Sequence, residues 1–153
     1  MNEIITIKRD DLNNRLQEFF DKQPEHVFIM DLVPTGESTI LCMYPETEFS
    51  QEHTFSTFLD NVKTRVPKES EQGVTYEIAE KMQNFIFKIR NLKLNKNKKL
   101  IVACKDGLRV SGAVALWAMD WLMGSNESEF NRLNPDIRPN EFLLYDLYLH
   151  PLI

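Results

Sequence analysis

A cysteine, a glycine, an arginine and a serine follow one another closely in the segment IVACKDGLRVSG, residues 101–112. An apolar run ends at Cys104, a polar turn follows, and an apolar, alanine-rich stretch begins at Ser111, which is the order strand, turn, helix. Backbone N–H groups in a tight turn that leads into a helix bind anions, and their positive field also favours a cysteine thiolate. The segment therefore predicts an anion-binding loop that carries a nucleophile.

Each residue type in this loop has a chemical use. Gly107 supplies the permissive backbone of a tight turn, Arg109 offers a two-pronged donor to an oxyanion, and Ser111 can cap the helix or hydrogen-bond the sulfur. Asp106 is discordant, since a fixed negative charge opposes anion binding unless it points outward. We expect a phosphate-binding loop formed by Lys105, Asp106, Gly107, Leu108 and Val110. A purely structural role, with a thiol buried at a strand end, stays open as an alternative.

The pattern of apolar residues predicts the elements that position this loop. Apolar runs predict strands over residues 3–8, 26–33, 38–44 and 99–104, and Cys42 is expected to be a core thiol within the third. Periodic apolar positions predict helices over 11–21, capped by Asp10 or Asp11, and over 75–92, 111–123 and 130–133. A last helix is expected to start at Pro139 and Asn140, and residues 45–74 to be mostly loop, with a short helical or extended piece at 55–62.

Strands that alternate with helices predict a single α/β domain over residues 1–153, with three layers and a mainly parallel sheet flanked by helices. Ligands bind such sheets at the carboxyl ends of the strands. Residues 104–111 follow one of these ends, so the predicted fold places the cysteine loop where a binding site is expected.

Composition and charge narrow the function classes. The chain has 153 residues, of which 42% are hydrophobic and 27% charged, as is usual for a globular domain. Its net charge of −5 argues against binding to nucleic acid or to an acidic membrane surface. Two cysteines make no secreted disulfide framework and no apolar run is long enough to span a membrane, so we expect a cytoplasmic protein, in the host cytoplasm if its source is viral. The three histidines match no metal spacing, and neither a metal nor another cofactor is expected.

The cysteine loop resembles that of the cysteine-dependent phosphatases, the dual-specificity and tyrosine phosphatase-like group, and in particular their small prokaryotic or phage members. The loop of that family reads Cys, five residues, Arg, then Ser or Thr, with Gly three positions after the Cys. Cys104, Gly107, Ser111 and Gly112 stand in this register. The segments HVFIMDLVPTGES and NPDIRPNEFLLYDLYL are similar to the family's early strand and closing helix. The resemblance implies a phosphatase-like fold.

Two loop positions depart from the family. Val110 stands where the family has its arginine, and Ala103 where it usually has a histidine before the cysteine. The family arginine grips the phosphate with two charge-assisted hydrogen bonds, and losing such a contact costs about 3 kcal/mol, roughly a hundredfold in rate. Arg109 lies one residue early. The resemblance also implies an aspartic general acid on another loop, for which Asp60 is the best positional match, ahead of Asp31 and Glu48.

The interpretation that follows is a catalytically impaired pseudophosphatase that binds a phosphorylated ligand or a protein partner. One alternative is an active protein phosphatase in which Cys104 attacks, Arg109 is a displaced anion ligand, Ser111 assists and Asp60 is the acid. A second alternative is a rhodanese-like sulfurtransferase, because Arg109 stands five positions after Cys104, as in the rhodanese loop. The sequence leaves open whether the protein is an enzyme, and it does not indicate an oligomeric state.

Overall fold

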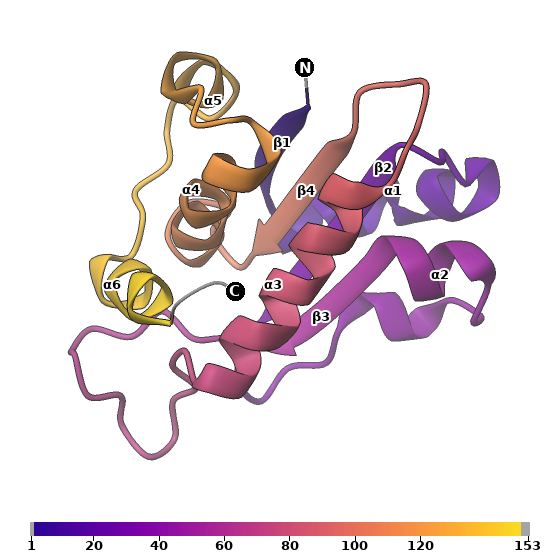
Figure 1. Cartoon of the computed structure of the whole chain (residues 1–153). Helices are drawn as coiled ribbons and strands as arrows, with labels where there is room; N and C mark the ends of the chain where they lie inside the picture. The colour runs from indigo at the N-terminus through magenta and orange to yellow at the C-terminus, as the bar shows by residue number, and fades with distance from the viewer. Residues whose placement is uncertain (1, 151–153) are drawn as a thin grey trace.

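Four parallel strands form the centre of the computed structural model, which describes residues 2–150. Within these residues the strand order is β1 (Glu3–Lys8), β4 (Lys99–Cys104), β2 (Val27–Val33) and β3 (Thr54–Phe58), and every pairing is parallel. Helices cover both faces of the sheet (Figure 1). The predicted three-layer α/β fold with a mainly parallel sheet is confirmed.

The two faces of the sheet carry separate hydrophobic clusters. On β4, Ile101 and Ala103 pack with α1 (Arg9–Lys22) and with Phe49 of α2 (Glu48–His53). The alternate residues Leu100, Val102 and Cys104 pack with α3 (Tyr76–Asn91) and α4 (Val110–Leu122) on the other face. Two further helices, α5 (Glu127–Leu133) and α6 (Glu141–Leu149), complete this second layer (Figure 1). Because strand side chains alternate between faces, one run of apolar residues supplies both clusters.

Helix α1 begins earlier than the sequence predicts. It starts at Arg9, directly after β1, and its cap residue Lys8 provides no side-chain hydrogen bond. Asp10 and Asp11 are therefore not caps but lie in the first turn, where negative charge favours the positive end of the helix dipole. The predicted apolar face is confirmed, since Leu12, Leu16, Phe19 and Phe20 are all buried.

The strand predicted over residues 38–44 is wrong. This segment forms a 3₁₀ helix, η1 (Ile40–Met43), whose cap Thr39 accepts a hydrogen bond from the Leu41 N–H. The Thr39 hydroxyl and the Ile40 N–H in turn donate to the Asp31 carboxylate, at 2.7 and 3.2 Å. Local side-chain bonds of this kind compete with pairing into a sheet. Cys42 is consequently exposed, and its thiol donates to the Thr39 carbonyl oxygen at 2.9 Å.

The fourth strand comes instead from the region expected to be mostly loop. Residues Thr54–Phe58 form β3, which pairs with Ile29–Val33 of β2, and the short helix α2 precedes it. The extended piece expected at 55–62 thus corresponds in part to a strand of the sheet. No helix in residues 2–150 has the length and apolar character needed to cross a membrane.

Candidate functional site

A cavity of about 330 Å³ opens at the carboxyl edge of the sheet, beside the cysteine loop. Three loops enclose it, each following a different strand. The loop after β2 contributes Pro34 and Thr35, the loop after β3 contributes Leu59, Asp60, Asn61, Ser70 and Glu71, and the loop after β4 contributes Lys105 and Asp106. Leu32, Cys104 and Val110 complete the lining. The structure therefore brings Cys104, Val110 and Asp60 together around one cavity.

Gly107 sets the shape of the cysteine loop. Its φ is +70°, in the left-handed region that favours glycine. A Cβ atom at this position would lie 2.7 Å from the Lys8 nitrogen and 2.8 Å from the Ile7 carbonyl carbon. The loop therefore packs directly against the backbone at the end of β1, and only glycine fits this contact.

Asp106 points into the loop rather than outward. Its Oδ1 accepts hydrogen bonds from the backbone N–H groups of Leu108 at 2.8 Å and Arg109 at 3.1 Å. Although burial raises the pKa of Asp106, these two N–H groups outweigh it, so the pKa falls below its ordinary value and the group is a carboxylate. Backbone donors that were expected to bind an external anion are thus occupied by a carboxylate of the chain itself.

Cys104 is only 2% exposed and lies at the end of β4. Its thiol contacts two acceptors, Ser111 Oγ at 3.1 Å and Asp106 Oδ1 at 3.3 Å. Burial raises the pKa of Cys104, and the adjacent Asp106 carboxylate raises it further, while the hydrogen bonds with Ser111 oppose the shift. The direction is opposite to that of a thiolate stabilised by an anion-binding loop, so Cys104 is a neutral thiol at neutral pH.

Arg109 and Val110 lie in different places although they are neighbours in the chain. Val110 is only 5% exposed and lines the cavity beside Cys104. Arg109 is exposed and lines a second cavity, together with Lys63 and Asn140. The residue six positions after Cys104 is therefore the one that faces the first cavity, and there it is apolar.

The other two loop residues differ in their contacts. The exposed Lys105 places its Nζ 3.8 Å from a carboxylate oxygen of Glu37. Leu108 is half-buried, and its carbonyl oxygen accepts a hydrogen bond from the Arg138 N–H at 3.1 Å. Lys105 is therefore the one cation among the side chains that line the first cavity, against the carboxylates of Asp60, Glu71 and Asp106.

Asp60 lines the same cavity as Cys104, but its carboxylate already has several donors. It accepts hydrogen bonds from the Thr35 N–H at 2.8 Å, the Thr35 hydroxyl at 2.5 Å and the Gln72 N–H at 2.6 Å. Burial raises the pKa of Asp60, but the bonds from Thr35 and Gln72 outweigh it and the pKa is lowered. A general acid must hold a proton near neutral pH, so these contacts suit a clamp between two loops better than an acid.

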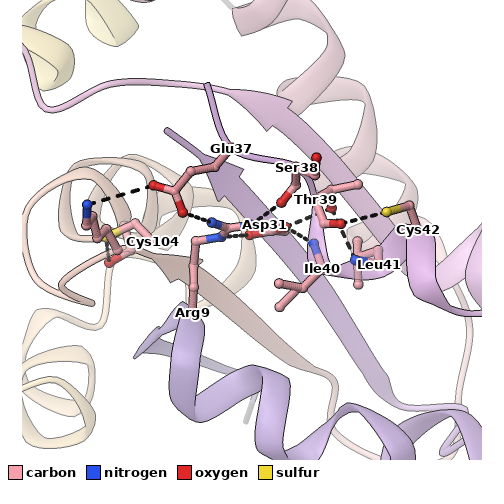
Figure 2. Close-up of polar contacts among 11 residues, drawn as sticks. Arg9, Asp31, Glu37, Ser38, Thr39, Ile40, Leu41, Cys42 and Cys104 are labelled. Atoms are coloured by element: carbon pink, nitrogen blue, oxygen red, sulfur yellow. Dashed lines mark hydrogen bonds and ion pairs between the residues drawn. The ribbon is translucent and has the colours of Figure 1, made fainter. Parts of the chain in front are cut away.

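Asp31 lies on the opposite face of the sheet from Cys104, within a buried polar network (Figure 2). Its carboxylate is 0% exposed and pairs with Arg9, whose Nε lies 2.7 Å from Oδ1 and whose second nitrogen lies 3.3 Å from Oδ2. Another Arg9 nitrogen lies 3.1 Å from Glu37, which also approaches Lys105. Asp31 is thus a structural ion-pair partner, and the network reaches the cysteine loop through Glu37.

Glu48, the other candidate for the general acid, is exposed in the first turn of α2 and does not line the cavity.

Arg9 and Glu37 are not among the site residues predicted from the sequence. A signal for Arg9 was present, because Asp31 is the single charge within the apolar run HVFIMDLV and a buried charge requires a partner.

Within residues 2–150 no group of three His, Cys, Asp or Glu side chains is arranged to hold a metal ion. His53 instead stacks on Phe28 and forms a hydrogen bond with the Val27 carbonyl oxygen at 2.9 Å.

The geometry as a whole describes a closed anion loop next to an acidic cavity. The donors of the loop hold Asp106, the thiol is neutral, and the cavity wall carries more negative than positive charge. Such an arrangement can bind a ligand by shape and by hydrogen bonds. Among the described residues that line the cavity, however, the cysteine is a neutral thiol, and Lys105 is present without an arginine that could bind a phosphate through two hydrogen bonds. Comparison with known proteins finds no family model and no curated protein that matches this chain.

Proposed function

We propose that this chain is a catalytically impaired, phosphatase-like protein, a pseudophosphatase, that binds a phosphorylated ligand or a protein partner around its cysteine loop. The observation that carries the proposal is the position of Asp106. Its carboxylate accepts the N–H groups of Leu108 and Arg109 and lies 3.3 Å from Cys104 Sγ. A phosphate that binds this loop would have to displace the Asp106 carboxylate. Because Asp106 is itself a residue of the loop, its carboxylate cannot diffuse away.

Phosphoryl transfer through a cysteine needs a thiolate, a cationic grip on the phosphate and an acid for the leaving group. The pKa of Cys104 is raised by burial and by Asp106, Val110 replaces the gripping arginine, and the pKa of Asp60 is lowered by its hydrogen bonds. These three observations support the binding function over phosphoryl transfer. Arg109, the displaced anion ligand of the active-phosphatase alternative, lines the second cavity.

The sulfurtransferase alternative meets the same obstacle at the sulfur. A cysteine that accepts and donates sulfur acts as a thiolate, whereas Cys104 is buried beside a carboxylate that raises its pKa. The arginine that suggested the rhodanese register does not line the cavity that contains Cys104. These placements favour the binding function over sulfur transfer.

The first experiment is a turnover assay with a generic aryl phosphate, comparing the wild type with Cys104→Ser. The proposal expects no turnover by the wild type above that of the variant. Turnover that disappears in Cys104→Ser would overturn the proposal and establish an active phosphatase. A parallel assay with thiosulfate and a cyanide acceptor tests sulfur transfer, and Cys104-dependent thiocyanate formation would establish that activity instead.

A further inference from the structure

A second cavity, of about 570 Å³, lies next to the first. Its walls come from the loop after β3, from the residue that precedes α4, and from the start of α6, with lining residues Asn61, Val62, Lys63, Arg109, Pro139, Asn140, Glu141 and Phe142. Asn61 lines both cavities, so the two are neighbours across one side chain. A ligand of moderate length can therefore contact both.

The two cavities differ in charge. The second is lined by two exposed cations, Lys63 and Arg109, and by one carboxylate, Glu141. Neither cation has a carboxylate within 4.0 Å among residues 2–150. The first cavity has the reverse balance, with three carboxylates and one lysine in its lining. An anionic group is therefore attracted to the second cavity and repelled by the first.

The backbone around the two cations is held by hydrogen bonds between the segments that form the walls. The Arg109 carbonyl oxygen accepts from the Asn140 N–H at 3.0 Å, and its N–H donates to Asp106. The Asn140 side chain donates to Asn61 Oδ1 and to the Val62 carbonyl oxygen, both at 2.7 Å. These bonds tie Arg109 and the residues just before Lys63 to the start of α6, which limits the entropic cost of binding.

We propose that the second cavity binds the phosphate group of a phosphate monoester through Arg109 and Lys63. This inference rests on the proposed function and specifies where the phosphorylated ligand is held: in the second cavity, on the side chain of Arg109, and not on the backbone donors of the cysteine loop. The loop donors are occupied by Asp106. The guanidinium of Arg109 interacts with Asp106 through charge, but among residues 2–150 it has no hydrogen-bond acceptor and no carboxylate within 4.0 Å, and it presents the planar fork that matches an oxyanion. The rest of the ligand extends past Asn61 toward the apolar side chains of the first cavity, Leu32, Leu59 and Val110.

The choice of a phosphate monoester follows from charge. A phosphate dianion matches the two cations of this cavity. Because the cavity lining carries two cations and one carboxylate, the net attraction is larger for a dianion than for a singly charged carboxylate. The aromatic ring of phenyl phosphate supplies an apolar part that can reach the first cavity. Phenyl phosphate should therefore bind more tightly than inorganic phosphate, and both more tightly than benzoate.

The test is a titration of the full chain with phenyl phosphate, inorganic phosphate and benzoate at low ionic strength, followed by ¹H–¹⁵N NMR. Arg109→Gln and Lys63→Gln should each weaken phenyl phosphate binding about tenfold or more, and Glu141→Gln should strengthen it, in line with the loss or gain of one charge-assisted contact. Lys88→Gln is the matched control, because it removes the same charge from an exposed site in the last turn of α3. It should leave the affinity within about twofold, and thermal melts confirm that each variant is folded.

Three outcomes overturn the inference. One is the absence of saturable phenyl phosphate binding by the wild type. Another is equal weakening by Lys88→Gln and Arg109→Gln, which indicates nonspecific attraction. The third is binding that survives Arg109→Gln and is lost in Lys105→Gln, which places the phosphate at the cysteine loop and leaves the proposed function standing. Failure of the proposed function itself is recognised separately, by aryl phosphate turnover that depends on Cys104.

Discussion

Cys104 Sγ lies 3.3 Å from Asp106 Oδ1, so the sulfur faces a carboxylate instead of an open ring of backbone donors. The same oxygen accepts the N–H groups of Leu108 and Arg109, and this makes Asp106 an internal counterpart of the anion such a loop can bind. Asp106 thus closes the loop and neutralises its positive field, and it adds to the effect of burial, which is the main cause of the raised pKa of Cys104. Several measurable consequences depend on this contact.

The reactivity of the two cysteines should differ widely. At pH 7, iodoacetamide should modify the exposed Cys42 well before the buried Cys104, because burial and Asp106 raise the pKa of Cys104 and only the thiolate reacts. Asp106→Asn keeps an acceptor oxygen near the loop N–H groups but removes the charge. It should therefore lower the pKa of Cys104 and increase its alkylation rate, about threefold or more, as followed by mass spectrometry of the intact protein. Equal rates for both cysteines in the wild type at pH 7 contradict this account.

Repair of the loop should require two changes. Val110→Arg alone should give no aryl phosphate turnover, because the new guanidinium lies in a cavity lined by Asp106 and Asp60 and pairs with them. Combining Val110→Arg with Asp106→Ala frees the loop donors and removes the charge that raises the pKa of Cys104. With p-nitrophenyl phosphate, whose good leaving group needs little acid catalysis, the double variant should show turnover at least about tenfold above either single variant. The matching triple variant with Cys104→Ser is the control, and activity that persists in it contradicts the proposed role of the thiol.

Gly107→Ala should be among the most destabilising single changes in the loop. Its φ of +70° costs about 1 kcal/mol for an alanine, and the Cβ contact with the β1 backbone at 2.7 Å adds about 1–3 kcal/mol. Gly124→Ala is the matched control, because its φ is +60° but no atom lies within 4 Å of a Cβ there. Urea unfolding should show a loss of about 1 kcal/mol for Gly124→Ala and about 2–4 kcal/mol for Gly107→Ala. Equal losses mean that the approach to β1 is unimportant.

The sequence predicts the elements whose apolar pattern is strong and fails where polar side chains decide the backbone. The runs 3–8, 26–33 and 99–104 correspond to strands β1, β2 and β4 as predicted. Burial between helix layers accounts for β2 and β4, whereas β1 is a mostly half-buried edge strand that pairs with β4. The run 38–44 looks equally apolar, but the Asp31 carboxylate binds Thr39 and Ile40 and draws the segment out of the sheet. That effect depends on Asp31, which is near in space but several residues away in sequence, and no local pattern reveals it.

The candidate site shows the same division. The order strand, turn, helix is enough to place Cys104 at the carboxyl edge of the sheet, where the cavity is found. It does not determine which way the loop side chains point. The direction of the side chains depends on the left-handed φ of Gly107 and on its contact with β1. With this backbone, Asp106 points into the loop and Arg109 points to the neighbouring cavity. Spacing in the sequence therefore identifies the loop but not the roles within it.

Asp60 should contribute to stability in a pH-dependent way. Its pKa is lower in the folded protein than the ordinary 3.8, so its contribution is fully present above about pH 4–5 and is lost as the pH falls through the folded pKa. Asp60→Asn replaces one acceptor oxygen with an NH₂ group that faces the donors of Thr35 and Gln72. It should cost about 1–3 kcal/mol at pH 7, measured by urea unfolding, and much less at pH 3. The exposed Glu80→Gln is the control. A cost for Asp60→Asn that is the same at both pH values indicates that the charge of Asp60 does not stabilise the fold.

The Arg9–Asp31 pair should behave as a buried unit that supports the site from the far face of the sheet. Arg9→Met leaves the Asp31 carboxylate, which is 0% exposed, with only Thr39 and Ile40 as donors, and it should cost about 3–5 kcal/mol. Adding Asp31→Leu removes the stranded charge, so the double variant should regain more than half of that loss in urea unfolding. If the double variant is no more stable than Arg9→Met alone, the unpaired charge of Asp31 is not the cause of the lost stability.

Arg9 also contacts Glu37, which approaches Lys105. The double variant should therefore shift the NMR signals of the cysteine loop even where its stability recovers, because stability depends on burying no unpaired charge, whereas the position of the loop depends on the contacts of Arg9 itself.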